Sequence, residues 1–252
     1  MRHLLLLSIV VFSGSLVFAQ TPDDPKDIAA DINARREGLY VDPHWQPSHK
    51  ERKLSKREKE LLFPSKALLA EFKPLLQLSG GNLARLFPNE KYPTAVGLLG
   101  ARSYYSFHRK TSLNEIDNID ASIYLKNSKF AAVLSGADIG FMINLGEVSL
   151  EDATLTLPSL RYLLEYQPPE VESEARQEKL QLLQKGVSAN GFLYNRDVVA
   201  QLNKTYALRY VSFGSFDHVV IFRTLRQLDD GSYIIAWKFI KKNSIPRFKR
   251  PR

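Results

Sequence analysis

The clearest pattern in this chain is an alternation of apolar and polar positions that begins after Gly80-Gly81. In KFAAVLSGADIGFMINLG, residues 129–146, apolar side chains recur at every second position on both sides of Gly136-Ala137. A period of two predicts β-strands, and a two-residue loop that begins with glycine is typical of a tight hairpin. The register places apolar pairs on one face. The expected pairs are Phe130 with Ile143, Ala132 with Phe141, and Leu134 with Ile139.

A second hairpin is predicted in RTLRQLDDGSYIIAWKF, residues 223–239. A two-residue Asp230-Gly231 loop would place Arg223 opposite Lys238, and like charges in that position repel each other. A three-residue loop, Asp229-Asp230-Gly231, avoids the repulsion and gives glycine the left-handed position. The segment is therefore interpreted as architecture, with the aspartates as turn residues. In this register Leu225 faces Ile235, Ile221 faces Phe239, and Arg223 lies over Trp237.

Helical patterns occur mainly outside these strands. PPEVESEARQEKLQLLQKG has prolines before it, acids early and Gly186 at its end, which predicts one surface helix with Leu180 and Leu183 as its apolar stripe. Nearer the N-terminus, Ser55 and Glu58 have capping-box spacing. Ser65 begins another short helix, which Pro74 is expected to kink or stop.

These patterns predict a β-rich α+β fold with antiparallel hairpins, arranged as a sandwich or half-open barrel, and one covering helix. The expected organisation is a signal peptide over residues 1–19, a polar, partly helical arm over residues 20–81, and a β-rich domain with a basic tail over residues 82–252. The arm includes a short helical pattern between Asp24 and Gly38.

The first residues, MRHLLLLSIVVFSGSLVFAQ, predict export. A basic start, an apolar run from Leu4 to Phe12, and small residues before Gln20 are typical of a secretory signal peptide, with an uncleaved anchor as the alternative. The chain contains no cysteine, so disulfides, thiol nucleophiles and cysteine-ligated metals are excluded. Export without cysteine is typical of a bacterial periplasmic or extracellular protein.

The formal net charge is +8, and two segments concentrate the excess. Lys50–Lys59 has six basic and two acidic residues, and the tail Lys241–Arg252 has six basic residues and no acidic one. Such segments attract anionic lipids or polysaccharides. The alternative is a solvated linker and a frayed terminus. Neither segment interleaves aromatic residues, so specific binding of nucleic acid is not expected.

Few residues have the pattern of a catalytic site. Asp217-His218 is a candidate acid–base pair, although neighbours in a strand point to opposite faces, and His108 ends another strand pattern. His44 and His49 lack a third metal ligand at a diagnostic spacing. The acids at residues 115, 117 and 120 lack the glycine and final glutamate of a calcium loop. No nucleophile elbow, P-loop or dinucleotide motif occurs, so no cofactor or metal is expected.

Three functions remain open. The first is a non-catalytic binding or structural module of the cell envelope, which we favour. The second is an exported hydrolase whose site is assembled from distant residues, and an acid beside His108 or His218 would favour it. The third is a carrier of an apolar ligand, which a cavity lined by the strand aromatics would favour.

Overall fold

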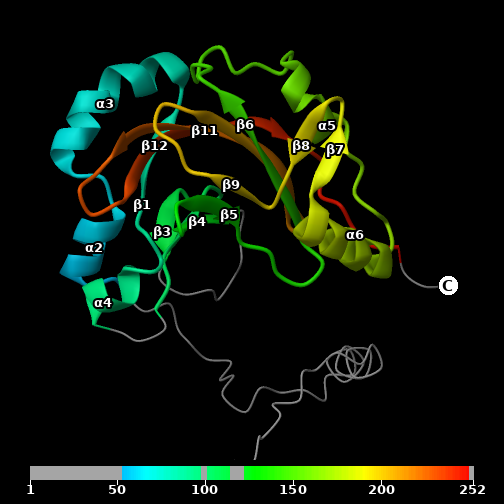
Figure 1. Cartoon of the computed structure of the whole chain (residues 1–252), viewed down its shortest axis with the longest axis horizontal. Coiled ribbons are helices and arrows are strands. Elements are labelled where there is room, and N and C mark those ends of the chain that lie inside the picture. Colours follow the sequence, from blue (N-terminus) through cyan, green and yellow to red (C-terminus); the bar gives the residue numbers. More distant parts are fainter. Residues whose placement is uncertain (1–52, 98–100, 114–121, 250–252) are drawn as a thin grey trace, which may run out of the picture. The chain divides into compact units, whose positions relative to one another are not determined.

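The computed structural model describes residues 53–97, 101–113 and 122–249, which belong to one compact unit (Figure 1). The predicted signal peptide and the helical pattern between Asp24 and Gly38 lie outside the described residues. The helices are α2 (Lys56–Leu62), α3 (Lys66–Ser79), α4 (Tyr92–Val96), the 3-10 helix η1 (Pro158–Leu160), α5 (Arg161–Glu165) and α6 (Glu172–Lys185). The strands are β1 (Asn82–Leu86), β2 (Tyr104–Ser106), β3 (Thr111–Leu113), β4 (Ser122–Lys126), β5 (Lys129–Ala132), β6 (Ile139–Gly146), β7 (Val187–Ala189), β8 (Phe192–Tyr194), β9 (Asp197–Val199), β10 (Thr205–Ser212), β11 (Phe216–Gln227) and β12 (Tyr233–Lys242).

Two five-stranded sheets form a sandwich, which is one of the two arrangements that the alternating pattern predicts. The main sheet has the order β1-β12-β11-β10-β6, and the second sheet has the order β3-β2-β4-β5-β9. A two-stranded sheet is formed by β7 and β8. All pairs of neighbouring strands in these sheets are antiparallel. The prediction of a β-rich fold built from antiparallel strands is therefore confirmed.

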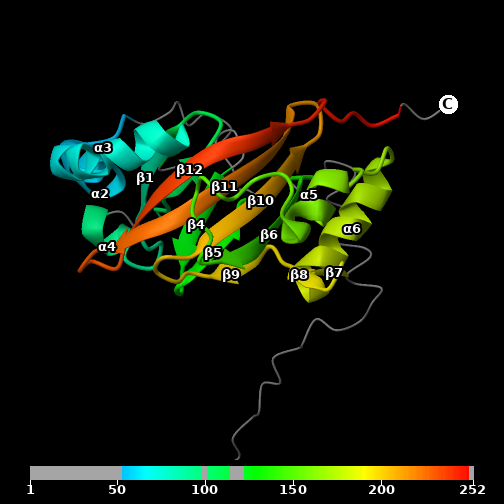
Figure 2. The same ribbon diagram turned by 90° about the horizontal axis from the view of Figure 1, so that it is seen from above.

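The main sheet is covered on both faces. An aromatic core fills the space between the two sheets, and a second core lies between the main sheet and α3, α5, α6 and the segment that follows β6 (Figures 1 and 2). As a result every residue of β10 is buried. An alternating pattern is typical of strands with one face in water, and the central strands differ from it because helices and loops occupy their second face. The inter-sheet core includes Phe107, Phe130, Tyr206, Phe222 and Trp237.

The hairpin predicted around Gly136-Ala137 does not form, although both of its strands do. β5 pairs with β4 and β9, whereas β6 pairs with β10 in the other sheet. Phe130 belongs to the inter-sheet core, while Ile143 packs in the core beneath the helices. The turn therefore carries the chain from one sheet to the other. Local alternation identified the strands, but the burial of both faces of the main sheet decided their partners.

The second hairpin, β11–β12, forms with the predicted three-residue loop. Gly231 has a φ of 87°, and Gln227 pairs with Tyr233 as that loop requires. Beyond the loop the register shifts by one residue between Thr224 and Arg226. Arg223 consequently pairs with Ala236, so the expected position of Arg223 over Trp237 is wrong. The other two expected pairs are wrong for the same reason: Thr224 lies opposite Ile235, and Ile221 lies opposite Lys238.

The helices begin and end near the predicted capping residues. The faces that they bury differ from the predicted faces. Ser55 and Glu58 form the predicted capping box of α2. Helix α3 continues through Pro74 to Ser79, so the proline does not stop it. On α6 the expected stripe is wrong, because Leu180 and Leu183 are 53% and 40% exposed. Ala175 and Leu182 contact the sheet instead.

Candidate functional site

Asp217 forms a buried ion pair with Arg209 on the helix-covered face of the main sheet. Nε and Nη2 of Arg209 donate to the two carboxylate oxygens at 2.9 and 2.6 Å. Nη1 of Arg209 donates to the carbonyl oxygens of Leu163 and Tyr166, at the end of α5. Nδ2 of Asn243 donates to Asp217 Oδ1 at 3.1 Å. The carboxylate is thus held by three donors, and the guanidinium of Arg209 joins α5 to the sheet.

His218 points to the opposite face and meets His108. Their ring centroids are 6.0 Å apart, and both rings stack on Phe216 at 5.4 Å. Within the described part of the chain, Nδ1 of His218 is buried without a hydrogen-bond partner, whereas His108 is exposed. The structure therefore brings together two of the three candidate residues, His108 and His218. It keeps the third, Asp217, on the other side of the sheet.

The stability of the protein should fall in mild acid because of His218. Burial, with the neighbouring charges of Lys242 and His108, lowers the pKa of His218 from 6.5 to about 4. The unfolded chain then takes up this proton more readily than the folded chain, so the contribution is complete above pH 6.5 and is lost as the pH falls through about 4. We expect a loss on the order of 3 kcal/mol in the free energy of unfolding.

The variant His218→Phe isolates this effect because it keeps an aromatic ring and removes the titration. Urea unfolding at pH 7 and pH 4 should show a smaller acid loss in the variant than in the wild type. Other titrating groups, such as Asp138, contribute equally to both proteins and cancel in the comparison. Equal losses in the two proteins would contradict the assignment.

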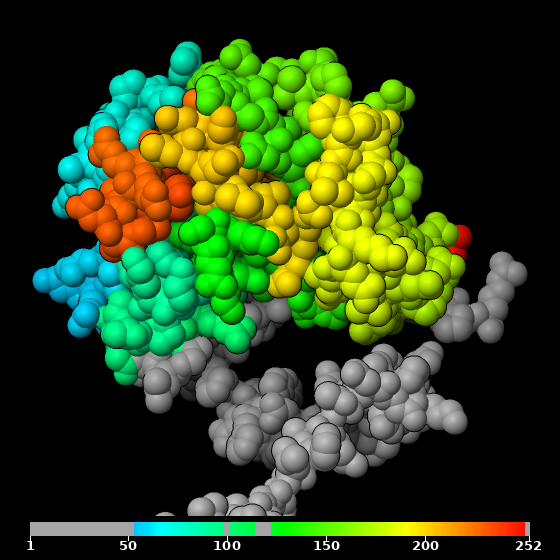
Figure 3. Space-filling view, in the orientation of Figure 1, coloured from blue at the N-terminus to red at the C-terminus, as the bar shows by residue number. Residues whose placement is uncertain are grey.

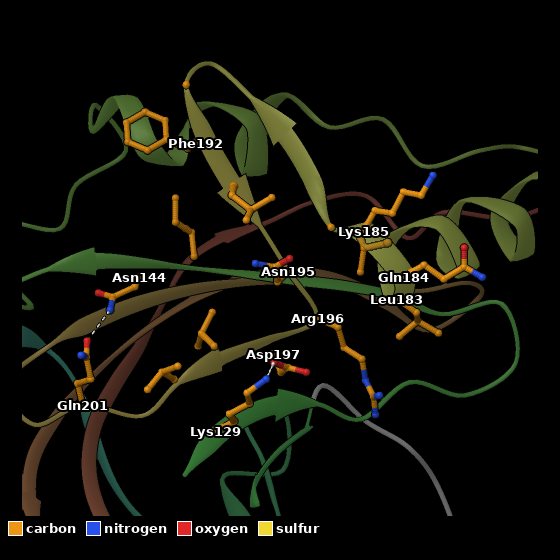
Figure 4. A pocket seen from close by; sticks show the side chains of 17 residues that line it. Lys129, Asn144, Leu183, Gln184, Lys185, Phe192, Asn195, Arg196, Asp197 and Gln201 are labelled. Carbon is orange, nitrogen blue, oxygen red and sulfur yellow. Dashed lines mark hydrogen bonds and ion pairs between the residues drawn. The ribbon is translucent and has the colours of Figure 1, made fainter. Parts of the chain in front are cut away.

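An open groove of about 820 Å³ lies elsewhere, beside β6 and β9 (Figures 3 and 4). It is bordered by the C-terminal end of α6, the β7–β8 hairpin and the two edge strands β6 and β9. Main-chain hydrogen bonds between Met142 and Asn195 join β6 to the β8–β9 connection. His108, Phe216 and His218 do not line the groove. The lining residues are Lys129, Ile143, Asn144, Leu182 to Gly186, Gly191 to Leu193, Asn195 to Val199, and Gln201.

Two polar pairs lie along one side of the groove. Lys129 Nζ is 2.9 Å from Asp197 Oδ1, and Asn144 Nδ2 donates to Gln201 Oε1 at 3.2 Å. In Figure 4 both pairs lie on the side opposite to the α6 residues Leu183 to Lys185. The lining contains three cationic side chains, Lys129, Lys185 and Arg196, but only one acidic side chain, Asp197. The groove therefore combines amide groups with a net positive charge.

The basic C-terminal tail makes specific contacts with the domain. Nζ of Lys241 donates to the carbonyl oxygen of Leu164, Lys249 pairs with Glu170, and Phe248 stacks on Phe213. The described part of the basic tail is therefore packed against the domain.

His44, His49 and the acids at residues 115, 117 and 120 lie outside the described residues. Most strand aromatics lie in the inter-sheet core, whereas Phe141 and Tyr194 lie in the core beneath the helices. The groove has a single aromatic residue, Phe192.

Sequence reasoning did not identify the groove. Its walls come from segments that are distant in sequence, and its residues are common amides, aliphatic residues and lysines without a motif. One local signal was available: Gly186, expected as a helix end, has a φ of 67° and a ψ of −170° that glycine alone adopts readily. A Cβ at this position would lie 2.2 Å from Oδ1 of Asn195. This close approach sets the position of a groove residue.

Comparisons with known proteins add no assignment. No protein-family model, curated protein or solved structure matches this chain. Within residues 53–97, 101–113 and 122–249, no cluster of three or more metal-binding side chains occurs. In the same part of the chain, every helix is too short or too polar to cross a lipid bilayer.

Proposed function

We propose that this protein is an exported, non-catalytic binding module of the bacterial cell envelope, and that the groove beside β6 and β9 holds an anionic polysaccharide. The observation that carries the proposal is the composition of the groove. Three cations and one acid line a space of about 820 Å³, together with the amides of Asn144, Asn195 and Gln201. Amides both donate to and accept from hydroxyl groups, and the excess cations attract a polyanion.

Export is supported by the N-terminal sequence, with its basic start, apolar run and small residues before Gln20. The basic segments Lys50–Lys59 and Lys241–Arg252 supply further positive charge for an anionic surface. In the described part of the tail, Lys242 and Arg247 are exposed. These side chains extend the positive surface outside the groove.

The two alternatives have weaker support. For a hydrolase, an acid with a raised pKa is present, since burial raises the pKa of Asp138. Asp138 accepts from the hydroxyl of Tyr210 at 3.2 Å, but β10 lies between β6, which begins directly after Asp138, and the strand of His218. A carrier would need aromatic side chains that line a cavity, but the strand aromatics of the inter-sheet core pack against one another. The groove composition therefore favours the binding module.

Charge changes inside the groove should alter retention on immobilised heparin, an anionic polysaccharide, in opposite directions. Lys185→Gln removes a cation and should lower the salt concentration at elution. Asp197→Asn releases Lys129 from its partner and should raise the salt concentration at elution. Each contact with an anionic group that is lost should reduce the slope of log affinity against log salt by roughly 1. The measurement is the elution point at several ionic strengths and a fixed pH.

Two matched variants separate the groove from the rest of the basic surface. Lys66→Gln changes an exposed lysine at the start of α3, and Arg247→Gln changes an exposed cation in the tail. Substitution is preferable to deletion of the tail, because deletion also removes the packing of Phe248 on Phe213. If only Arg247→Gln alters elution, binding belongs to the tail and the groove proposal is wrong.

A further inference from the structure

Three side chains that can carry positive charge converge at one end of the inter-sheet core. Lys242 on β12 is the cross-strand partner of His218 on β11, so their side chains share a face. His108 reaches the same place from the turn between β2 and β3, with its ring centroid 6.0 Å from that of His218. Phe239 joins the cluster: its ring lies 4.9 Å from His218 and 5.0 Å from Lys242 Nζ.

Among the described residues, the acid nearest to His218 does not balance these charges from the same face. The carboxylate nearest to His218 in sequence, that of Asp217, faces the other side of the sheet, where Arg209 binds it. When His218 is protonated, the like charges of His218 and Lys242 are unfavourable without a counter-ion. In addition, His218 is only 8% exposed, and its Nδ1 has no hydrogen-bond partner among the described residues. A buried polar atom of this kind calls for a partner that the described residues do not supply.

We propose that His108, His218 and Lys242 form a binding site for a phosphate group. The phosphate oxygens accept hydrogen bonds from Lys242 Nζ and from imidazole N–H groups, and such charge-assisted hydrogen bonds are stronger than neutral ones. Because a bound anion stabilises protonated imidazole, binding tightens as the pH falls. Phe216 and Phe239 hold the two rings and limit access of water. The site shares no residue with the groove, although Lys242 also belongs to the basic tail.

The site can be tested by following the imidazole Cε1–H resonances of His108 and His218 while inorganic phosphate is added to the full chain at pH 6. Ionic strength is kept constant with chloride. We expect both resonances to shift along one saturable curve. Lys242→Gln should weaken the affinity by about tenfold, because one charge-assisted hydrogen bond is lost. Lys126→Gln, an exposed lysine on β4, should leave the affinity unchanged.

The source of the phosphate group is distinguished by a second arm. Vesicles of phosphatidylcholine with and without phosphatidylglycerol are added to the wild type and to Lys242→Gln. Binding that needs phosphatidylglycerol and is weakened in the variant identifies a lipid headgroup. Phosphate binding without vesicle binding identifies a soluble phosphate or phosphoester. Absence of a saturable phosphate shift, or an equal affinity in Lys242→Gln, overturns the site whatever the vesicles show. A matching resonance pattern before phosphate is added verifies that the variant is folded.

Discussion

Replacing Arg209 with methionine is expected to lower the free energy of unfolding by about 3–5 kcal/mol, because it leaves the buried carboxylate of Asp217 without its partner. The two side chains are only 3% and 2% exposed, and the guanidinium also binds two carbonyl oxygens after η1. The variant therefore loses hydrogen bonds that hold α5 against the main sheet. Urea unfolding at pH 7 measures the effect.

The double variant Arg209→Met with Asp217→Leu is the control. It removes both charges together, so it should be considerably more stable than Arg209→Met alone. This comparison also bears on the candidate role of Asp217. If the carboxylate acts only in structure, the double variant should keep the binding properties of the wild type. A loss below about 1 kcal/mol in Arg209→Met would show that the ion pair is not a major support of the fold.

Replacing Gly186 with alanine is expected to cost about 2–5 kcal/mol, through backbone strain and overpacking together. The φ of 67° and ψ of −170° disfavour a side chain, and the added Cβ would lie 2.7 Å from the carbonyl oxygen of Tyr194 as well as close to the amide of Asn195. Since the main chain of Asn195 bonds to Met142, relief of the clash must move a wall of the groove.

Gly191→Ala provides the matched comparison. Gly191 also has a positive φ, of 79°, but a Cβ at this position meets no atom within 4 Å. This variant should therefore cost only about 1 kcal/mol, from the backbone term alone. Thermal unfolding and heparin elution of the two variants separate backbone strain from displacement of the groove. Equal losses in the two variants would contradict the role assigned to the contact with Asn195.

Strands, caps and turns were predictable where the responsible chemistry is local. The capping box of Ser55 and Glu58 and the three-residue loop ending in Gly231 each depend on residues a few positions apart. The incorrect predictions concern features that depend on contacts between residues distant in the sequence. The register shift at Leu225 follows contacts across the sheet, and Ala175, not Leu180, contacts the main sheet because of the way in which α6 lies on it.

The candidate site shows the same division. Sequence pointed to His108 and His218, because histidines are scarce and noticeable, but it gave no reason to place them 6.0 Å apart. The opposite directions of Asp217 and His218 followed from strand geometry alone. The burial of Asp217 under α5, and the groove between β6 and β9, required coordinates.

By itself, the amino-acid sequence determined the antiparallel, β-rich character of this protein, the ends of several elements and the absence of cysteine chemistry. Backbone preference, capping and alternation act over a few residues, so these features can be read from a short window. Only the tertiary structure decided which strands pair, which face of each is covered and where the groove and the histidine pair lie. An apolar side chain specifies burial but not its partner, because the hydrophobic effect has no direction.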